Sequence, residues 1–258
     1  MAKTLLMIHG VGCGGDVWDR MIPAFEADGW ICEAPTLFPD KRVKENPPDS
    51  LAELGLDDYI AAMADKARDI AQATGGMPAV IGHSMGGLIA QVLAEKGVVS
   101  QAVFLTPAQP KGCLVIGPGV AFTFLNILIR QNRKKSYKVW RTGFDFGVTN
   151  CVPKRLREEI YSHALYDSGK VYGDLSDGIE IDESKITIPT LTIAAGKDRA
   201  TLATAVRKVG MKYSHAPVPG EFREYPLNGH WIVDEPGTDQ VAADIVAWLA
   251  RTRTKETA

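Results

Sequence analysis

Short apolar runs alternate with longer amphipathic stretches along most of this chain. The candidate strands are residues 4–8, 30–34, 79–81, 101–105, 190–194 and 222–225. The candidate helices are residues 18–28, 56–74, 86–95, 201–209 and 239–251. Runs this short and this apolar are typical of parallel strands that are buried on both faces. The alternation therefore predicts a doubly wound, mostly parallel sheet of about six strands flanked by helices, with functional residues at the carboxyl ends of the strands.

The sequence GHSMG at residues 82–86 lies where a buried strand is expected to turn into a helix. A serine on such a turn is held out of the sheet with its hydroxyl exposed, and the flanking glycines let the strand and the helix approach closely. By itself, Ser84 could equally be the N-cap of the helix. Its position, however, fits three further motifs along the chain.

Each of these three motifs follows an expected strand. The sequence HGVG at residues 9–12 ends the first strand, Asp198 follows the fifth, and His230 follows the sixth. A serine hydroxyl is a poor nucleophile at neutral pH, so a histidine must accept its proton and a carboxylate must orient that histidine. Ser84, Asp198 and His230 supply these three groups.

Together, these motifs resemble those of the α/β-hydrolase superfamily, and the resemblance covers most of the chain. It implies the α/β-hydrolase fold and a catalytic triad of Ser84, Asp198 and His230. It also implies an oxyanion hole formed by the backbone N–H groups of Val11 and Met85, which would stabilise the developing alkoxide. The sheet would begin at what the family counts as its third strand.

The alternation of strands and helices is interrupted over residues 107–185. Members of the family commonly insert a cap at this point, so the resemblance divides the chain into core residues 1–106, a cap or lid insertion at residues 107–185, and core residues 186–258. The uncharged stretch at residues 113–129 is too short, and too interrupted by glycine and proline, for a transmembrane helix. We expect instead a helix over residues 120–130 that covers an apolar pocket, packs on the sheet, meets a second subunit in a homodimer, or attaches to a lipid surface.

The residues expected to line the substrate pocket come from the motifs and from the cap. They are Gly12, His83, Phe122, Phe124, His163 and Trp231. His83 directly precedes the proposed nucleophile, and we also expect it to have a structural role. Specificity would be set mainly by inward side chains of the cap, with Phe122 and Phe124 as the first candidates.

Composition limits the remaining classes of function. With 258 residues, 45% hydrophobic residues and a net charge of -2, the chain can bury a sizeable core and gives no indication of a nucleic-acid partner. The four cysteines are widely spaced without a zinc-binding pattern, and no phosphate-binding motif is found, so neither a metal nor a cofactor is expected. The N-terminal residues lead directly into the first strand without room for a signal peptide, so we expect a cytoplasmic protein.

The expected function is a serine hydrolase that cleaves a small, largely apolar carboxylic ester through an acyl-enzyme intermediate, with thioesters, carbamates, amides and lactones as variants. The chain also resembles the methylesterase and hydroxynitrile lyase branch of the family. Lyases of that branch have threonine in place of Gly10 and lysine in place of Trp231, so cyanohydrin cleavage is disfavoured. Two alternatives remain: a cofactor-free lyase or C–C bond hydrolase, and a non-catalytic ligand-binding protein on the same scaffold.

Overall fold

The computed structural model describes residues 3–130 and 132–253, and its centre is a parallel β-sheet. Six strands form this sheet in the described residues, in the order β2-β1-β3-β4-β7-β8, and every neighbouring pair is parallel. The strands are β1 (Lys3–Ile8), β2 (Trp30–Glu33), β3 (Ala79–His83), β4 (Ala102–Leu105), β7 (Thr190–Ala195) and β8 (Glu221–Tyr225). The predicted doubly wound sheet is therefore confirmed, and each strand agrees with its expected range to within two residues.

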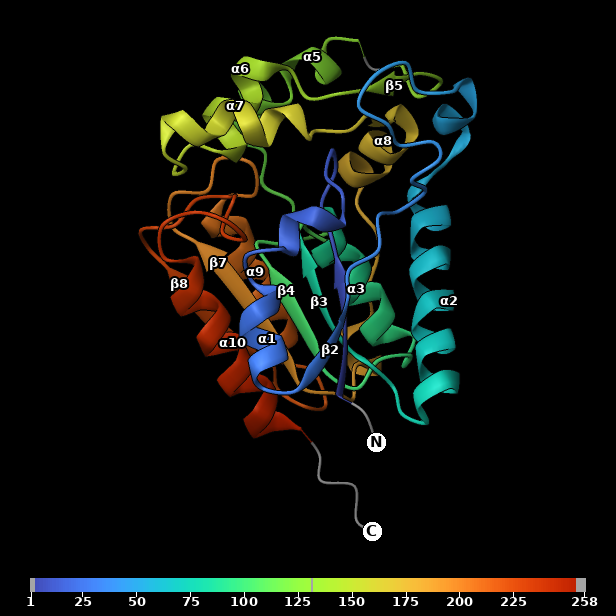
Figure 1. Ribbon diagram of the computed structural model, residues 1–258, viewed down its shortest axis with the longest axis vertical. Coiled ribbons are helices and arrows are strands. Elements are labelled where there is room, and N and C mark those ends of the chain that lie inside the picture. Colours follow the sequence, from blue (N-terminus) through green and yellow to red (C-terminus); the bar gives the residue numbers. More distant parts are fainter. Residues whose placement is uncertain (1–2, 131, 254–258) are drawn as a thin grey trace.

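Helices cover both faces of the sheet because successive side chains of each strand point to opposite faces. Leu5 and Met7 of β1 pack in one hydrophobic cluster, and Leu6 and Ile8 pack in the other. The first cluster includes residues of α1 (Ile22–Ala27) and α10 (Thr238–Thr252). The second includes residues of α2 (Leu56–Thr74), α3 (Met85–Glu95) and α9 (Ala203–Tyr213). Figure 1 shows α1 and α10 next to each other, with α2 and α3 on the other side of the sheet.

The expected helix over residues 18–28 is only partly correct. The structure divides this range into a 3-10 turn, η1 (Gly15–Trp18), and the short helix α1. Pro23 lies in the first turn of α1. Because proline has no backbone N–H and is tolerated mainly in the first turn, a helix that contains it at this position begins close to it.

Residues 107–185, here called the upper segment, lie mostly above the carboxyl ends of the strands, and after α8 (Gly169–Asp177) the chain descends beside the sheet towards β7 (Figure 1). The segment consists of short elements: α4 (Pro118–Thr123), α5 (Leu125–Leu128), β5 (Ser136–Tyr137), α6 (Arg141–Gly143), the π-helical turn η3 (Phe144–Val148), α7 (Lys154–Ser162), β6 (Asp167–Ser168), α8 (Gly169–Asp177) and the 3-10 turn η4 (Glu183–Lys185). A further 3-10 turn, η2 (Asp49–Glu53), precedes α2. Buried residues of the upper segment belong to the same two hydrophobic clusters as the sheet. The division of the chain into a core and a separate cap therefore stays a prediction.

The single helix expected over residues 120–130 is wrong. Two short helices, α4 and α5, meet at Phe124, whose backbone (φ −103°, ψ 18°) departs from the α-helical region. The Asn126 side chain donates to the Lys138 carbonyl oxygen at 2.9 Å, and its carbonyl oxygen accepts from the Trp140 N–H at 3.3 Å. These contacts tie α5 to a distant part of the chain, which local helical spacing cannot anticipate. No helix among the described residues is long and apolar enough to cross a membrane.

Candidate active site

Ser84 lies at the turn between β3 and α3 in a strained conformation. Its φ is +56° and its ψ is −120°, a combination that a residue with a side chain adopts only when its surroundings enforce it. A Cβ atom at position 82 would collide with the carbonyl of Gly86, and one at position 86 would collide with the carbonyl of Ile8. Glycines at these two positions therefore allow α3 to pack across the ends of the strands, which forces the sharp turn at Ser84.

Ser84, His230 and Asp198 form a continuous line of hydrogen bonds. The Ser84 Oγ atom is 3.0 Å from His230 Nε2, and His230 Nδ1 is 2.8 Å from Asp198 Oδ2. All three residues are buried. Since the carboxylate can only accept, we assign the imidazole proton to Nδ1, which leaves Nε2 free to accept the serine hydroxyl proton. The structure thus brings together the three residues that the sequence suggested for a Ser-His-Asp triad, with the geometry of that triad.

Donors from the loop after β7 fix the Asp198 carboxylate. Its Oδ1 atom accepts from the backbone N–H groups of Ala200 (2.7 Å) and Thr201 (2.8 Å). The Thr201 hydroxyl lies 2.8 Å from Asp198 Oδ2 and 3.0 Å from the Thr106 carbonyl oxygen. The sequence analysis did not identify Thr201. The only feature of the sequence that points to it is its position three residues after Asp198.

Glu235, a second residue that the sequence did not suggest, organises the loop that carries His230. It is buried, and its Oε1 atom accepts from the Asn228 side-chain amide (3.0 Å) and from the Gly229 N–H (2.6 Å). Burial raises the pKa of Glu235, although both hydrogen bonds oppose this shift. The carboxyl group therefore anchors the two residues that directly precede His230.

His83 contacts the same loop through a hydrogen bond. It is buried, and its Nε2 atom is 2.9 Å from the carbonyl oxygen of His230. Burial, followed by the neighbouring His230, lowers the pKa of His83 to about 3, so the ring is neutral at neutral pH. A neutral ring with its proton on Nε2 donates to that carbonyl, which fits the expected structural role.

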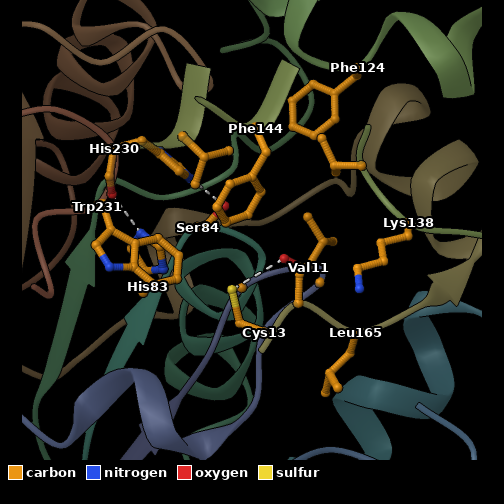
Figure 2. A pocket seen from close by; sticks show the side chains of 15 residues that line it. Val11, Cys13, His83, Ser84, Phe124, Lys138, Phe144, Leu165, His230 and Trp231 are labelled. Carbon is orange, nitrogen blue, oxygen red and sulfur yellow. Dashed lines mark hydrogen bonds between the residues drawn. The ribbon is translucent and has the colours of Figure 1, made fainter. Parts of the chain in front are cut away.

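A small chamber of about 20 Å³, the catalytic chamber, lies directly at Ser84. Figure 2 shows it: His230 and Phe144 lie close to Ser84, whereas Phe124 and Lys138 lie on the far side of the chamber from Trp231 in this view. Because the chamber holds little more than one water molecule, a substrate must also occupy a neighbouring space.

Two larger cavities adjoin the catalytic chamber. The large cavity, of about 380 Å³, has Ser84 in its wall and is lined mainly by apolar side chains of the upper segment, among them Leu114, Phe124, Ile127, Leu128 and Tyr172. Arg133 and Asp177 are the charged residues of its wall. The side cavity, of about 280 Å³, shares Phe144 and Trp231 with the catalytic chamber and has charged residues in its wall. Sequence reasoning missed most of the residues that line the large cavity, because the chain beyond residue 113 shows no regular pattern that marks an inward face.

The residues expected in the substrate pocket have separate outcomes. Gly12, His83, Phe124 and Trp231 line the catalytic chamber. His163 lines the side cavity instead, where its Nδ1 atom is 2.9 Å from Asp16 Oδ2.

The expectation that Phe122 faces the pocket is wrong, because its side chain lies outside all three cavities. It is 37% exposed and packs against Trp140 and Phe146, with ring centroids 5.2 and 4.9 Å apart. Residues two positions apart on a helix point in nearly opposite directions, so Phe122 and Phe124 do not share one face.

Val11 and Met85, whose backbone N–H groups are expected to form an oxyanion hole, line the large cavity together with Ser84. The loop that carries Val11 approaches closely, since a Cβ atom on Gly10 would lie 2.9 Å from Ser84 Cβ. Among residues 3–130 and 132–253, no group of three or more His, Cys, Asp or Glu side chains is arranged to hold a metal ion.

Comparison with known proteins places this fold and site in a family. Residues 5–244 match the model of the alpha/beta hydrolase family, so the chain belongs to that family, and the resemblance drawn from the motifs is confirmed. A search of curated proteins finds no match.

Solved structures with the same fold include a monoacylglycerol lipase from Paleococcus ferrophilus, which is 19% identical (TM-score 0.72, 97% of this chain and 95% of that chain covered). Tomato methylketone synthase I, in complex with 2-tridecanone, is 14% identical (TM-score 0.71, 98% and 100% covered). A methylesterase from Arabidopsis is 18% identical (TM-score 0.66, 97% and 98% covered). At these identities the likeness shows a shared fold.

Proposed function

We propose that this protein is a serine hydrolase that cleaves small, largely apolar carboxylic esters through an acyl-enzyme intermediate. The observation that carries the proposal is the hydrogen-bonded line from Ser84 through His230 to Asp198, beside a cavity that is lined mostly by apolar side chains. The lipase and the methylesterase among the similar structures act on esters by their names, which favours the same bond here. Thioesters, carbamates, amides and lactones would follow the same acyl-transfer route.

In the proposed mechanism, Ser84 Oγ attacks the ester carbonyl carbon while His230 Nε2 takes the hydroxyl proton. Asp198 stabilises the imidazolium that forms. His230 then gives its proton to the departing alkoxide, which leaves as an alcohol with the acyl group bound to Ser84. A water molecule, deprotonated by His230 in the same way, releases the carboxylic acid and restores Ser84.

The negative charge on the carbonyl oxygen would be stabilised by the N–H groups of Val11 and Met85. In the part of the chain that the structure describes, neither N–H group donates a hydrogen bond to another residue. Fixed donors of this kind need no reorganisation during the reaction, and loss of one typically costs about 3 kcal/mol of transition-state stabilisation.

The upper segment would act as the cap of this site. Its apolar side chains form most of the wall of the large cavity, so an apolar acyl or alcohol group of the substrate would displace water from the neighbourhood of Ser84. Gly12, His83, Phe124 and Trp231 would then contact the reacting ester, because they line the catalytic chamber.

The proposal is tested with a fluorophosphonate probe and a series of p-nitrophenyl esters from acetyl to decanoyl. We expect the probe to label the protein and the esters to be hydrolysed, and both properties to be lost in Ser84→Ala. Absence of labelling and of hydrolysis would favour a non-catalytic binding protein. Cleavage of β-diketones without hydrolysis of any ester would favour a C–C bond hydrolase or lyase.

A homodimer through the cap is a further proposal. Four large apolar side chains that are exposed to solvent, Ile116, Phe122, Leu125 and Ile129, come from one short stretch of the upper segment, and apolar side chains gathered on a surface are typical of a contact with another molecule. Light scattering on the purified protein should give the mass of a dimer, and Ile129→Glu should shift it to a monomer. A monomeric wild-type protein would contradict this proposal.

A cytoplasmic location remains a prediction from the sequence.

A further inference from the structure

The upper segment holds the loop that contains Val11 through both backbone groups of Gly12. The N–H of Gly12 donates to Asp167 Oδ2, and its carbonyl oxygen accepts from the Leu165 N–H at 2.8 Å. Gly12 has a φ of +69°, a conformation that favours glycine. The residue next to Val11 is therefore fixed in space by residues of β6 and the chain before it.

Asp167 is itself held by a buried ion pair. Arg42 contacts both carboxylate oxygens, with Nε 2.7 Å from Oδ1 and Nη2 2.9 Å from Oδ2, and the Tyr59 hydroxyl donates to Oδ1 at 2.8 Å. The side chains of Arg42 and Asp167 are both 0% exposed. A buried ion pair seldom stabilises a fold more than an apolar pair of the same size would. Its presence beside the Val11 loop therefore suggests a purpose other than stability.

Arg42 also contacts the Val11 loop directly. Its Nη2 atom donates to the Cys13 carbonyl oxygen at 2.9 Å, and its Nη1 atom lies 3.2 Å from His9 Nε2. Burial, with the nearby Arg42 charge, lowers the pKa of His9 to about 3, so His9 Nε2 is a neutral acceptor. Hydrogen bonds therefore hold the loop on both sides of Val11.

We propose that Asp167 and Arg42 are positioning residues that aim the Val11 N–H at the oxyanion, so that the upper segment completes the oxyanion hole. This inference rests on the proposed function. Asp167 supplies the acceptor that orients Gly12, and Arg42 neutralises the charge of that acceptor. An unpaired carboxylate bonded to Gly12, the residue next to Val11, would oppose the negative charge of the transition state.

The test compares two tyrosine variants, since removal of either charge of a buried ion pair can prevent folding. Tyr59→Phe removes one hydrogen bond to Asp167 and keeps both charges. Tyr213→Phe is the matched control, because Tyr213 is also buried and its hydroxyl donates to Gln91 Oε1 at 2.7 Å, away from the Val11 loop. Arg42→Lys is the stronger variant, because lysine keeps the charge and cannot bridge both carboxylate oxygens.

We expect kcat for p-nitrophenyl esters to fall about tenfold in Tyr59→Phe and on the order of 100-fold in Arg42→Lys, with little change in KM, as for a misplaced oxyanion donor. Tyr213→Phe should keep the wild-type kcat while its melting temperature falls as much as that of Tyr59→Phe. A trifluoromethyl ketone, which forms an oxyanion on Ser84, should bind more weakly in proportion to kcat. The corresponding alcohol should bind to all variants equally.

Three outcomes are distinguishable. A parallel loss of kcat and of ketone affinity in Tyr59→Phe and Arg42→Lys supports the inference. Wild-type kcat in both variants, with lowered melting temperatures alone, overturns it and leaves the proposed function standing. A wild-type protein that neither hydrolyses the esters nor reacts with the fluorophosphonate probe overturns the proposed function, and this inference with it.

Discussion

Phe122 and Phe124 lie two residues apart and have different surroundings. Phe124 lines both the catalytic chamber and the large cavity, whereas Phe122 packs against Trp140 and Phe146 at the surface. Both are phenylalanines near the junction of α4 and α5, and replacement of either by alanine removes the same side-chain volume. They form a matched pair that separates substrate selection from packing.

We expect Phe124→Ala to change the preference between short and bulky esters by about 1–3 kcal/mol, which is what one hydrophobic contact can discriminate. Phe122→Ala should lower the melting temperature and leave that preference unchanged. The measurement is kcat/KM for the acetyl and decanoyl esters with each variant. An equal change of preference in both variants would contradict the assignment of the large cavity as the substrate site.

At the scale of elements, the loop between β8 and α10 determines where the histidine lies. Glu235 is the anchor of this loop, because its Oε1 atom accepts from Asn228 and Gly229, whereas its Oε2 atom has no partner among the described residues. Burial raises the pKa of Glu235, which favours its neutral form relative to an exposed glutamate. What the loop requires is therefore one acceptor oxygen.

Glu235→Gln keeps that oxygen and should retain most of the activity and stability. Glu235→Ala leaves the Gly229 N–H without its acceptor and removes one of the two acceptors of the Asn228 amide, which should cost about 1–3 kcal/mol of stability and lower kcat. Kinetics with one ester and thermal unfolding of the three proteins check this prediction. If glutamine is as damaging as alanine, the charge of Glu235 matters and its role as an acceptor does not explain the loop.

The sequence also allowed most elements to be predicted. Strands such as β3 and helices such as α2 are marked by local periodicity alone, and α2 agrees with its expected range of 56–74 at both ends. The helix expected over residues 120–130 failed because its course depends on Asn126, which bonds to a segment more than ten residues away. Local patterns carry no information about such contacts.

At the scale of the whole molecule, the triad could be predicted from the sequence, whereas the residues that hold the Val11 loop could not. Ser84, Asp198 and His230 each follow a strand, and the parallel sheet brings the carboxyl ends of its strands to one edge, so their meeting could be predicted. Arg42 and Asp167 are 125 residues apart and neither lies in a recognisable motif. Only the folded chain reveals that they meet beside the Val11 loop.

The buried histidines make the stability of the whole molecule depend on pH. Burial lowers the pKa of His9 and of His83 from 6.5 to about 3. In the unfolded chain both rings return to ordinary values, so below about pH 6.5 the unfolded state binds protons that the folded state does not. The free energy of unfolding should therefore fall as the pH drops from about 6.5 towards 3, by up to about 1.4 kcal/mol per pH unit for each histidine.

Urea unfolding between about pH 7 and pH 5, above the range in which most carboxylates titrate, measures this slope. We expect His83→Gln to remove about half of it, because His9 continues to contribute and a glutamine amide does not titrate. His215→Gln is the control, since His215 is exposed and its ring contacts only the end of its own helix, at the Met211 carbonyl oxygen and the Ser214 hydroxyl. A slope that is unchanged in His83→Gln would mean that the ring accepts a proton in the folded state. In that case it could not hold the His230 carbonyl as a neutral donor.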